Sequence, residues 1–81
     1  MFGICNLAIV PMRAEADDRS EIVSQILFGE HFEVLQISKQ WAFIRQQFDG
    51  YEGWIDIKQF APISASDFNQ LSTADIVLNL D

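Results

Sequence analysis

Residues 41–55 read Trp-Ala-Phe-Ile-Arg-Gln-Gln-Phe-Asp-Gly-Tyr-Glu-Gly-Trp-Ile. This stretch predicts a β-hairpin, because residues that favour strands flank an Asp-Gly pair. Asp49-Gly50 is the strongest short hairpin signal in the chain. A type I′ turn requires positive φ at both central residues, and Asp followed by Gly tolerates that conformation best. We therefore expect a two-residue turn with one strand on either side.

The predicted turn also fixes which side chains face one another across the hairpin. A two-residue loop gives the pairs Phe48–Tyr51, Arg45–Trp54 and Ile44–Ile55. Because strand side chains alternate in direction, Ala42, Ile44 and Ile55 share one face. That aliphatic face is the one that a small core would bury.

The opposite face is predicted to be an aromatic surface beside a cation. Its members are Trp41, Phe43, Arg45 and Trp54. Exposed aromatic clusters usually mark interaction sites, so Trp41, Phe43 and Trp54 are candidate binding residues. Tyr51, at the hairpin tip, is a further candidate because its hydroxyl could reach a ligand. The face predicts binding rather than catalysis.

Each of these residues also has a purely structural interpretation. The three aromatic side chains would then pack against residues 64–81 or against another domain. Arg45 would form a cation–π pair with Trp54, and Tyr51 would pack on Phe48 across the hairpin.

Length and composition restrict the class of protein. The 81 residues suffice for one small domain, and an apolar fraction of 49% is ample for a core. A net charge of −7 argues against nucleic acid and anionic membranes as partners. No apolar run approaches the roughly 20 residues of a membrane span, and no signal peptide is evident. The sequence as written predicts a cytoplasmic protein; removal of a leader would place it in the cell envelope instead.

The remaining segments before residue 62 follow in order. We predict a first strand over Phe2–Val10, ended by Pro11. Residues 22–27 stay open between a helix and a strand, since their apolar spacing is helical and their β-branched content favours a strand. His31–Ile37 is predicted as a strand, and residues 56–60 as at most one helical turn.

Residues 12–21 form a long, charged connection, and such loops often carry function. Its acidic residues are Glu15, Asp17, Asp18 and Glu21. They are either a solvated surface or a site for an amino group. Their spacing does not match a calcium loop, and a lone Cys5 with a lone His31 cannot form a closed zinc site. We expect no cofactor, no metal and no catalytic residue; Cys5 is predicted to be a buried structural thiol.

The end of the chain is predicted to differ from the rest. We place a barrel domain at residues 1–62, ended by Pro62, and a linker with a short helix and a strand at residues 63–81. Ser64 or Ser66 would cap the helix. The expected strand at Ala74–Leu80 opens a following domain, docks on its own barrel, or joins a homodimer.

The order of several short motifs resembles the bacterial SH3-like domain over roughly residues 4–60. They are Val10-Pro11-Met12-Arg13, Leu27-Phe28-Gly29-Glu30, Phe32-Glu33-Val34-Leu35, Trp41 and Gly53-Trp54-Ile55. A second set of motifs is similar, more narrowly, to the first SH3-like domain of NlpC-type cell-wall cysteine peptidases, which cut after γ-D-glutamate in peptidoglycan stem peptides. This set comprises Gly3–Leu7, Arg13–Glu15, Gly29–Leu35 and Phe48–Asp56. The resemblance implies an all-β barrel of five or six strongly bent antiparallel strands, and a strand at residues 22–27.

The resemblance also implies a role. The chain would be a non-catalytic module that binds or positions a stem peptide, or docks on the catalytic domain. In that family the first SH3-like domain can help to shape the site for the amino end of the peptide, where the acidic residues of the loop would act. The alternative is a structural or protein-interaction module with no contact to the cell wall.

Overall fold

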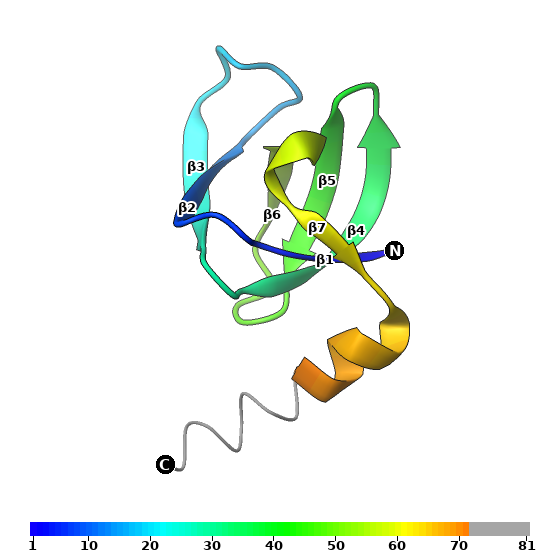
Figure 1. Ribbon diagram of the computed structural model, residues 1–81. Helices are drawn as coiled ribbons and strands as arrows, with labels where there is room; N and C mark the ends of the chain where they lie inside the picture. Colours follow the sequence, from blue (N-terminus) through cyan, green and yellow to red (C-terminus); the bar gives the residue numbers. More distant parts are fainter. Residues whose placement is uncertain (72–81) are drawn as a thin grey trace.

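Within residues 1–71, seven short strands form one antiparallel sheet that curls around a single core (Figure 1). The structure is a computed structural model, and it describes residues 1–71. The strands are β1 (Phe2–Ile4), β2 (Ile9–Arg13), β3 (Ile22–Leu27), β4 (His31–Ser38), β5 (Trp41–Gln46), β6 (Glu52–Asp56) and β7 (Ala61–Ile63). Their order in the sheet is β3-β2-β6-β5-β4-β1-β7. The predicted all-β, SH3-like fold is confirmed.

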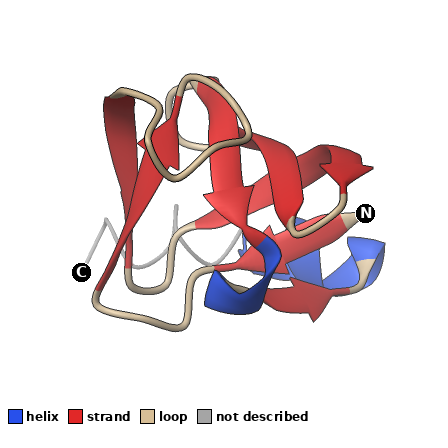
Figure 2. Cartoon of the chain, turned by 90° about the horizontal axis from the view of Figure 1, so that it is seen from above, coloured by secondary structure: helices blue, strands red, loops and turns tan. Residues whose placement is uncertain are grey.

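The core lies on the face that the alternation of the hairpin predicts. Ala42, Ile44 and Ile55 are fully buried. They pack with Cys5 and with a cluster drawn from β2–β6, which includes Met12, Ile26 and Phe32. Viewed from above, the strands surround this interior, and the short helical segments lie outside it (Figure 2).

The predicted turn between β5 and β6 is wrong, although the faces are right. The observed pairs are Arg45–Glu52, Ile44–Gly53 and Phe43–Trp54. The loop therefore has four residues, 47–50, and only Gly50 has positive φ (72°). The carboxylate of Asp49 accepts a hydrogen bond from the Tyr51 amide (2.9 Å), so Asp49 does not adopt a type I′ conformation. Because the shift is two residues, the side chains keep their faces.

The predicted strand over Phe2–Val10 is also wrong, because the chain turns a corner at residues 5–8. Ile4 pairs with His31 and Ala61, whereas Ile9 pairs with Leu27. The two halves thus belong to different parts of the sheet. Cys5 holds the corner, since its amide donates to Glu30 (2.9 Å) and its carbonyl accepts from Gly29 (2.8 Å). This break and the added strand β7 give seven strands instead of five or six.

Pro11 lies within β2 rather than ending it. It faces Gln25 of β3, and the Gln25 carbonyl accepts a hydrogen bond from the buried Gln46 side chain (3.0 Å). The backbone of Gln25 therefore points away from β2, so this pair is one that does not exchange ladder bonds. A proline, which has no N–H, therefore removes no hydrogen bond between β2 and β3 at this position.

Residues 22–27 form a strand, as the family resemblance implied. The turn that follows, Leu27–Glu30, is closed by a bond from the Glu30 amide to the Leu27 carbonyl (3.0 Å). Gly29 occupies its third position at φ 85°, which a residue with a side chain rarely adopts. His31–Ser38 and the single helical turn η1 (Ile57–Gln59) also agree with the prediction.

The chain beyond residue 60 is partly joined to the barrel. Pro62 lies inside β7, which pairs with β1 at the edge of the sheet. A helix follows over residues 65–71, capped by Ser64, whose hydroxyl accepts from the Asp67 amide (3.0 Å). Phe68 on this helix stacks on Phe2, with ring centroids 4.3 Å apart. The strand predicted at Ala74–Leu80 lies outside the described residues.

No helix within residues 1–71 has the length and apolar character needed to cross a membrane.

Two buried glycines let aromatic rings and strands approach closely. A Cβ on Gly3 would lie 2.6 Å from the Phe60 ring and 2.7 Å from the Phe32 ring. A Cβ on Gly53 would meet the Met12 side chain at 3.1 Å and the Arg13 carbonyl at 3.2 Å. The absence of a side chain at Gly3 thus leaves the space that the fully buried Phe32 ring occupies.

We predict that Gly3→Ala lowers the free energy of unfolding by about 1–3 kcal/mol, because the fully buried Phe32 ring has little room to move. Urea denaturation followed by circular dichroism measures this change. Ser66→Ala, at an exposed position of the helix, is the control and should stay within about 0.5 kcal/mol of the parent. Equal stability of the two variants would contradict the close approach at Gly3.

Candidate binding surface

The outer face of β5 and β6 carries an aromatic pair. Phe43 and Trp54 face each other across the two strands, and their ring centroids lie 5.1 Å apart at an interplanar angle of 49°. Both are half-buried. The Gln46 amide donates to Tyr51, so residues 43 and 54 form a non-hydrogen-bonded pair, in which side chains approach most closely. Strand pairing therefore builds this contact directly.

A row of charges lies beside the aromatic pair. Arg45 of β5 faces Glu33 of β4 on one side and Glu52 of β6 on the other. Its guanidinium bonds the Glu33 carboxylate at 2.6 Å and lies 3.7 Å from that of Glu52. The predicted cation–π pair of Arg45 with Trp54 is wrong, because the observed register places Glu52 opposite Arg45 and Trp54 opposite Phe43.

Trp41 lies on the same side of the sheet but is not part of an exposed surface. Only 6% of it is accessible, so the prediction of an outward tryptophan is wrong at this position. Alternation fixes the side of the sheet on which a residue lies, but not which other segments cover that side. The exposed part of the aromatic surface is therefore reduced to Phe43 and Trp54.

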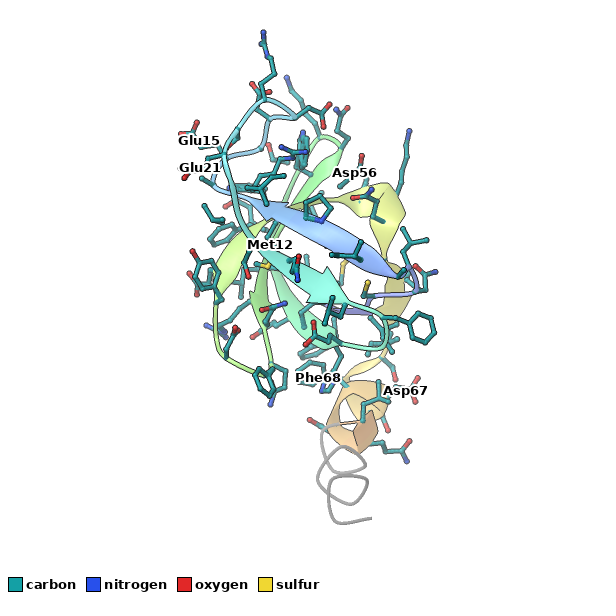
Figure 3. All side chains as sticks on the ribbon, turned by 90° about the vertical axis from the view of Figure 1, so that its left-hand side faces the viewer. Met12, Glu15, Glu21, Asp56, Asp67 and Phe68 are labelled. Atoms are coloured by element: carbon teal, nitrogen blue, oxygen red, sulfur yellow. The ribbon has the colours of Figure 1, made fainter. Side chains whose placement is uncertain are left out.

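The acidic loop that follows β2 is ordered by its own hydrogen bonds. The Ala14 amide donates to Glu21 (2.9 Å), and the Arg13 guanidinium donates to the Ser20 carbonyl (3.0 Å). Asp17 accepts from the Arg19 amide at 2.8 Å. The carboxylates of the loop are exposed, and Figure 3 places Glu15 and Glu21 with Asp56 in the upper part of the barrel, away from Phe68. The loop thus presents negative charge at one end of the molecule.

The candidate residues do not form one site. Phe43 and Trp54 are in contact, and Arg13 of β2 faces Trp54, so the loop with Glu15 and Asp17 begins beside the pair. Tyr51 is 43% exposed and lies at the other end of β6 from Asp56. Phe48 is 88% exposed and so forms no packed pair with Tyr51, contrary to the structural interpretation of the hairpin tip.

Three flanking residues, Arg13, Glu33 and Glu52, were not identified from the sequence. Glu33 and Arg13 reach this surface through pairing with β5 and β6, and pairing between distant strands leaves no local signal. The predicted two-residue loop pairs Arg45 with Trp54, so it does not bring Glu52 to Arg45. A prediction that allowed hairpin loops of either two or four residues would have included the pair Arg45–Glu52.

Cys5 and His31 occupy interior positions. The Cys5 thiol is 1% exposed and donates to the Leu7 carbonyl at 3.2 Å. His31 is 5% exposed, and its ring lies nearly perpendicular to that of Phe68, with ring centroids 5.0 Å apart. These contacts fit the structural role predicted for the thiol. Within the part of the chain that the structure describes, no group of three or more His, Cys, Asp and Glu side chains is arranged to hold a metal.

Residues 12–60 match the family model of the bacterial dipeptidyl-peptidase SH3 domain. The match covers more than half of the chain, from the end of β2 to the residue after η1. It therefore includes the acidic loop, the aromatic pair and the row of charges. No curated protein matches the chain. The narrower resemblance to NlpC-type peptidases stays a prediction.

We predict that Arg45 is coupled more strongly to Glu33 than to Glu52. Double-mutant cycles with Arg45→Met, Glu33→Gln and Glu52→Gln, measured by urea denaturation, should give about 0.5–1 kcal/mol for the hydrogen-bonded Glu33 pair. The longer Glu52 contact should give less, and salt should reduce both. The pair Arg19–Asp17, which is more exposed, is the control and should show almost no coupling. A stronger coupling to Glu52 would contradict the observed geometry.

Proposed function

Because the chain belongs to the family of bacterial dipeptidyl-peptidase SH3 domains, we propose that it binds or positions a peptidoglycan stem peptide for an NlpC-type cell-wall peptidase. Domains of this family are accessory modules of peptidases and not their catalytic units. In this proposal the peptidase supplies the chemistry, and the chain supplies a surface for one end of the substrate.

The half-buried Phe43–Trp54 pair is the observation that carries the proposal. Two aromatic rings in contact on the outer face of a rigid sheet offer apolar area at little entropic cost, because strand pairing already holds them. The Glu33–Arg45–Glu52 row borders the pair and has a net negative charge. A peptide with a free ammonium group would meet both apolar and anionic contacts at this surface.

The acidic loop adds to this proposal. Glu15, Asp17, Asp18 and Glu21 are exposed on a loop that its own hydrogen bonds order. An ordered loop loses less entropy on binding than a mobile one. The amino end of a stem peptide, or the side-chain amine of its diamino acid, would be received by these carboxylates. The net charge of −7 also supports an amine as the group that is bound, since it favours cationic groups on the ligand.

The proposal predicts that the tripeptide L-alanyl-γ-D-glutamyl-diaminopimelate binds at Trp54. Titration followed by the two indole N–H signals in ¹H–¹⁵N spectra, with Trp54→Phe to assign them, should shift the Trp54 signal saturably at about millimolar ligand. Phe43→Ala should weaken binding by about tenfold, which corresponds to the loss of one aromatic contact.

Two controls accompany this titration. Phe48→Ala removes an aromatic residue that is 88% exposed at the hairpin tip, and it should leave the affinity unchanged. N-acetylation of the tripeptide removes its α-amino charge, and it should weaken binding if the loop carboxylates receive that group. An absence of saturable shifts up to about 10 mM peptide would contradict the proposal and favour a structural or protein-interaction module instead.

A further inference from the structure

Arg13 is a cation at the border of the aromatic pair, and the group that it bonds is neutral. It faces Trp54 across β2 and β6, and side chains directly opposite each other in an antiparallel pair share one face. Its guanidinium donates to the Ser20 carbonyl, with Nη1 and the oxygen 3.0 Å apart. Within residues 1–71, Arg19 and Arg45 form ion pairs with carboxylates, whereas Arg13 forms none.

The acidic residues of β6 are engaged elsewhere. Glu52 and Asp56 flank the position that Arg13 faces, and strand alternation puts both on the same side of the sheet. Glu52 faces Arg45, and the Asp56 carboxylate accepts from the Lys58 amide at 2.8 Å. A guanidinium carries several N–H donors, and the bond to the loop carbonyl uses only one of them. Arg13 therefore retains donors for a further acceptor.

We propose that Arg13 binds the α-carboxylate of the D-glutamate in the stem peptide and so determines the specificity of this surface. This role of Arg13 rests on the function proposed above, and it names the ligand group that the cation recognises. A guanidinium matches a carboxylate in shape and can bond both of its oxygens. Arg13 is half-buried, so water screens its charge less than the charge of a fully exposed side chain.

The choice among the carboxylates of the peptide follows from its amino end. In L-alanyl-γ-D-glutamyl-diaminopimelate one peptide bond separates the α-amino group from the D-glutamate α-carboxylate, so the two charges lie about 5–6 Å apart. Glu15, a candidate acceptor for the amine, lies two residues after Arg13, and two residues of extended chain span about 6–7 Å. Ser20 holds both, since its hydroxyl accepts from the Glu15 amide (2.9 Å) and its carbonyl accepts from Arg13. This spacing of cation and anion complements the amino end, whereas the carboxylates of the diaminopimelate lie further along the peptide.

Amidation of the D-glutamate α-carboxylate tests this role, because it removes the charge from the ligand without changing the protein. Titrations followed at the Trp54 indole compare the tripeptide with its D-isoglutaminyl form. We expect amidation to raise the Kd about tenfold for the parent chain, and less than about twofold for Arg13→Met. Arg45→Met is the matched control. Arg45 also borders the aromatic pair, but its guanidinium already bonds Glu33 at 2.6 Å, so the effect of amidation should remain.

The comparison separates recognition by Arg13 from a structural role in holding the loop. A structural role would weaken binding of both peptides by the same factor in Arg13→Met, so amidation would have the same effect as in the parent, and this result would overturn the proposal. Amidation without effect on the parent would overturn it as well, even if Arg13→Met failed to fold, which far-UV circular dichroism shows. Arg13→Lys should keep only part of the effect, since an ammonium cannot bond both oxygens in a planar fork.

The proposed function and the role of Arg13 fail in different ways. Saturable binding of the tripeptide together with either of these two results leaves the proposed function intact and removes only the role of Arg13. An absence of tripeptide binding removes both. Amidation at the diaminopimelate residue is the ligand control, and its effect should be the same in the parent and in Arg13→Met. An effect that Arg13→Met abolishes there instead would assign Arg13 to the wrong end of the peptide and contradict the proposal.

Discussion

The antiparallel pairing of β5 with β6 determines both the interior and the outer surface of this domain. One set of positions places Ala42, Ile44 and Ile55 in the core, where they are fully buried. The alternate set places Phe43 against Trp54 and Arg45 against Glu52 on the outer face. A slip by one residue would exchange the two sets, and both the core and the aromatic surface would be lost. Gly53 lets β2 close over this pairing, because any side chain there would meet the Arg13 carbonyl.

Sequence patterns predicted the fold where local chemistry decides it. Alternation identified the buried face of the hairpin, and the capping serine identified the helix after Ser64. The predicted length of the hairpin loop was wrong because Asp49 is compatible with two local conformations. One is a type I′ turn; the other, which the chain adopts, lets the Asp49 carboxylate accept a hydrogen bond from the Tyr51 amide. The predicted extent of the first strand was wrong because the corner at Cys5 depends on hydrogen bonds to Gly29 and Glu30, which are distant in the sequence.

The binding surface was predicted only in part, for a related reason. Strand alternation places Trp41 on the outer side, but the packing of other segments decides its exposure of 6%. Glu33 joins the surface through the pairing of β4 with β5, which no short motif encodes. The result is a domain with an aromatic pair on the outer face of β5 and β6 and exposed carboxylates on the loop after β2, which begins beside that pair.

The register of the hairpin is the claim on which this description depends most directly, and proton NMR measures it. Non-hydrogen-bonded pairs bring α-carbons to about 4.5 Å, so their α-protons give a strong nuclear Overhauser effect. The account predicts such an effect between the α-protons of Phe43 and Trp54, and another between those of Arg45 and Glu52. A strong effect between Arg45 and Trp54 instead would indicate a two-residue turn and would contradict the account.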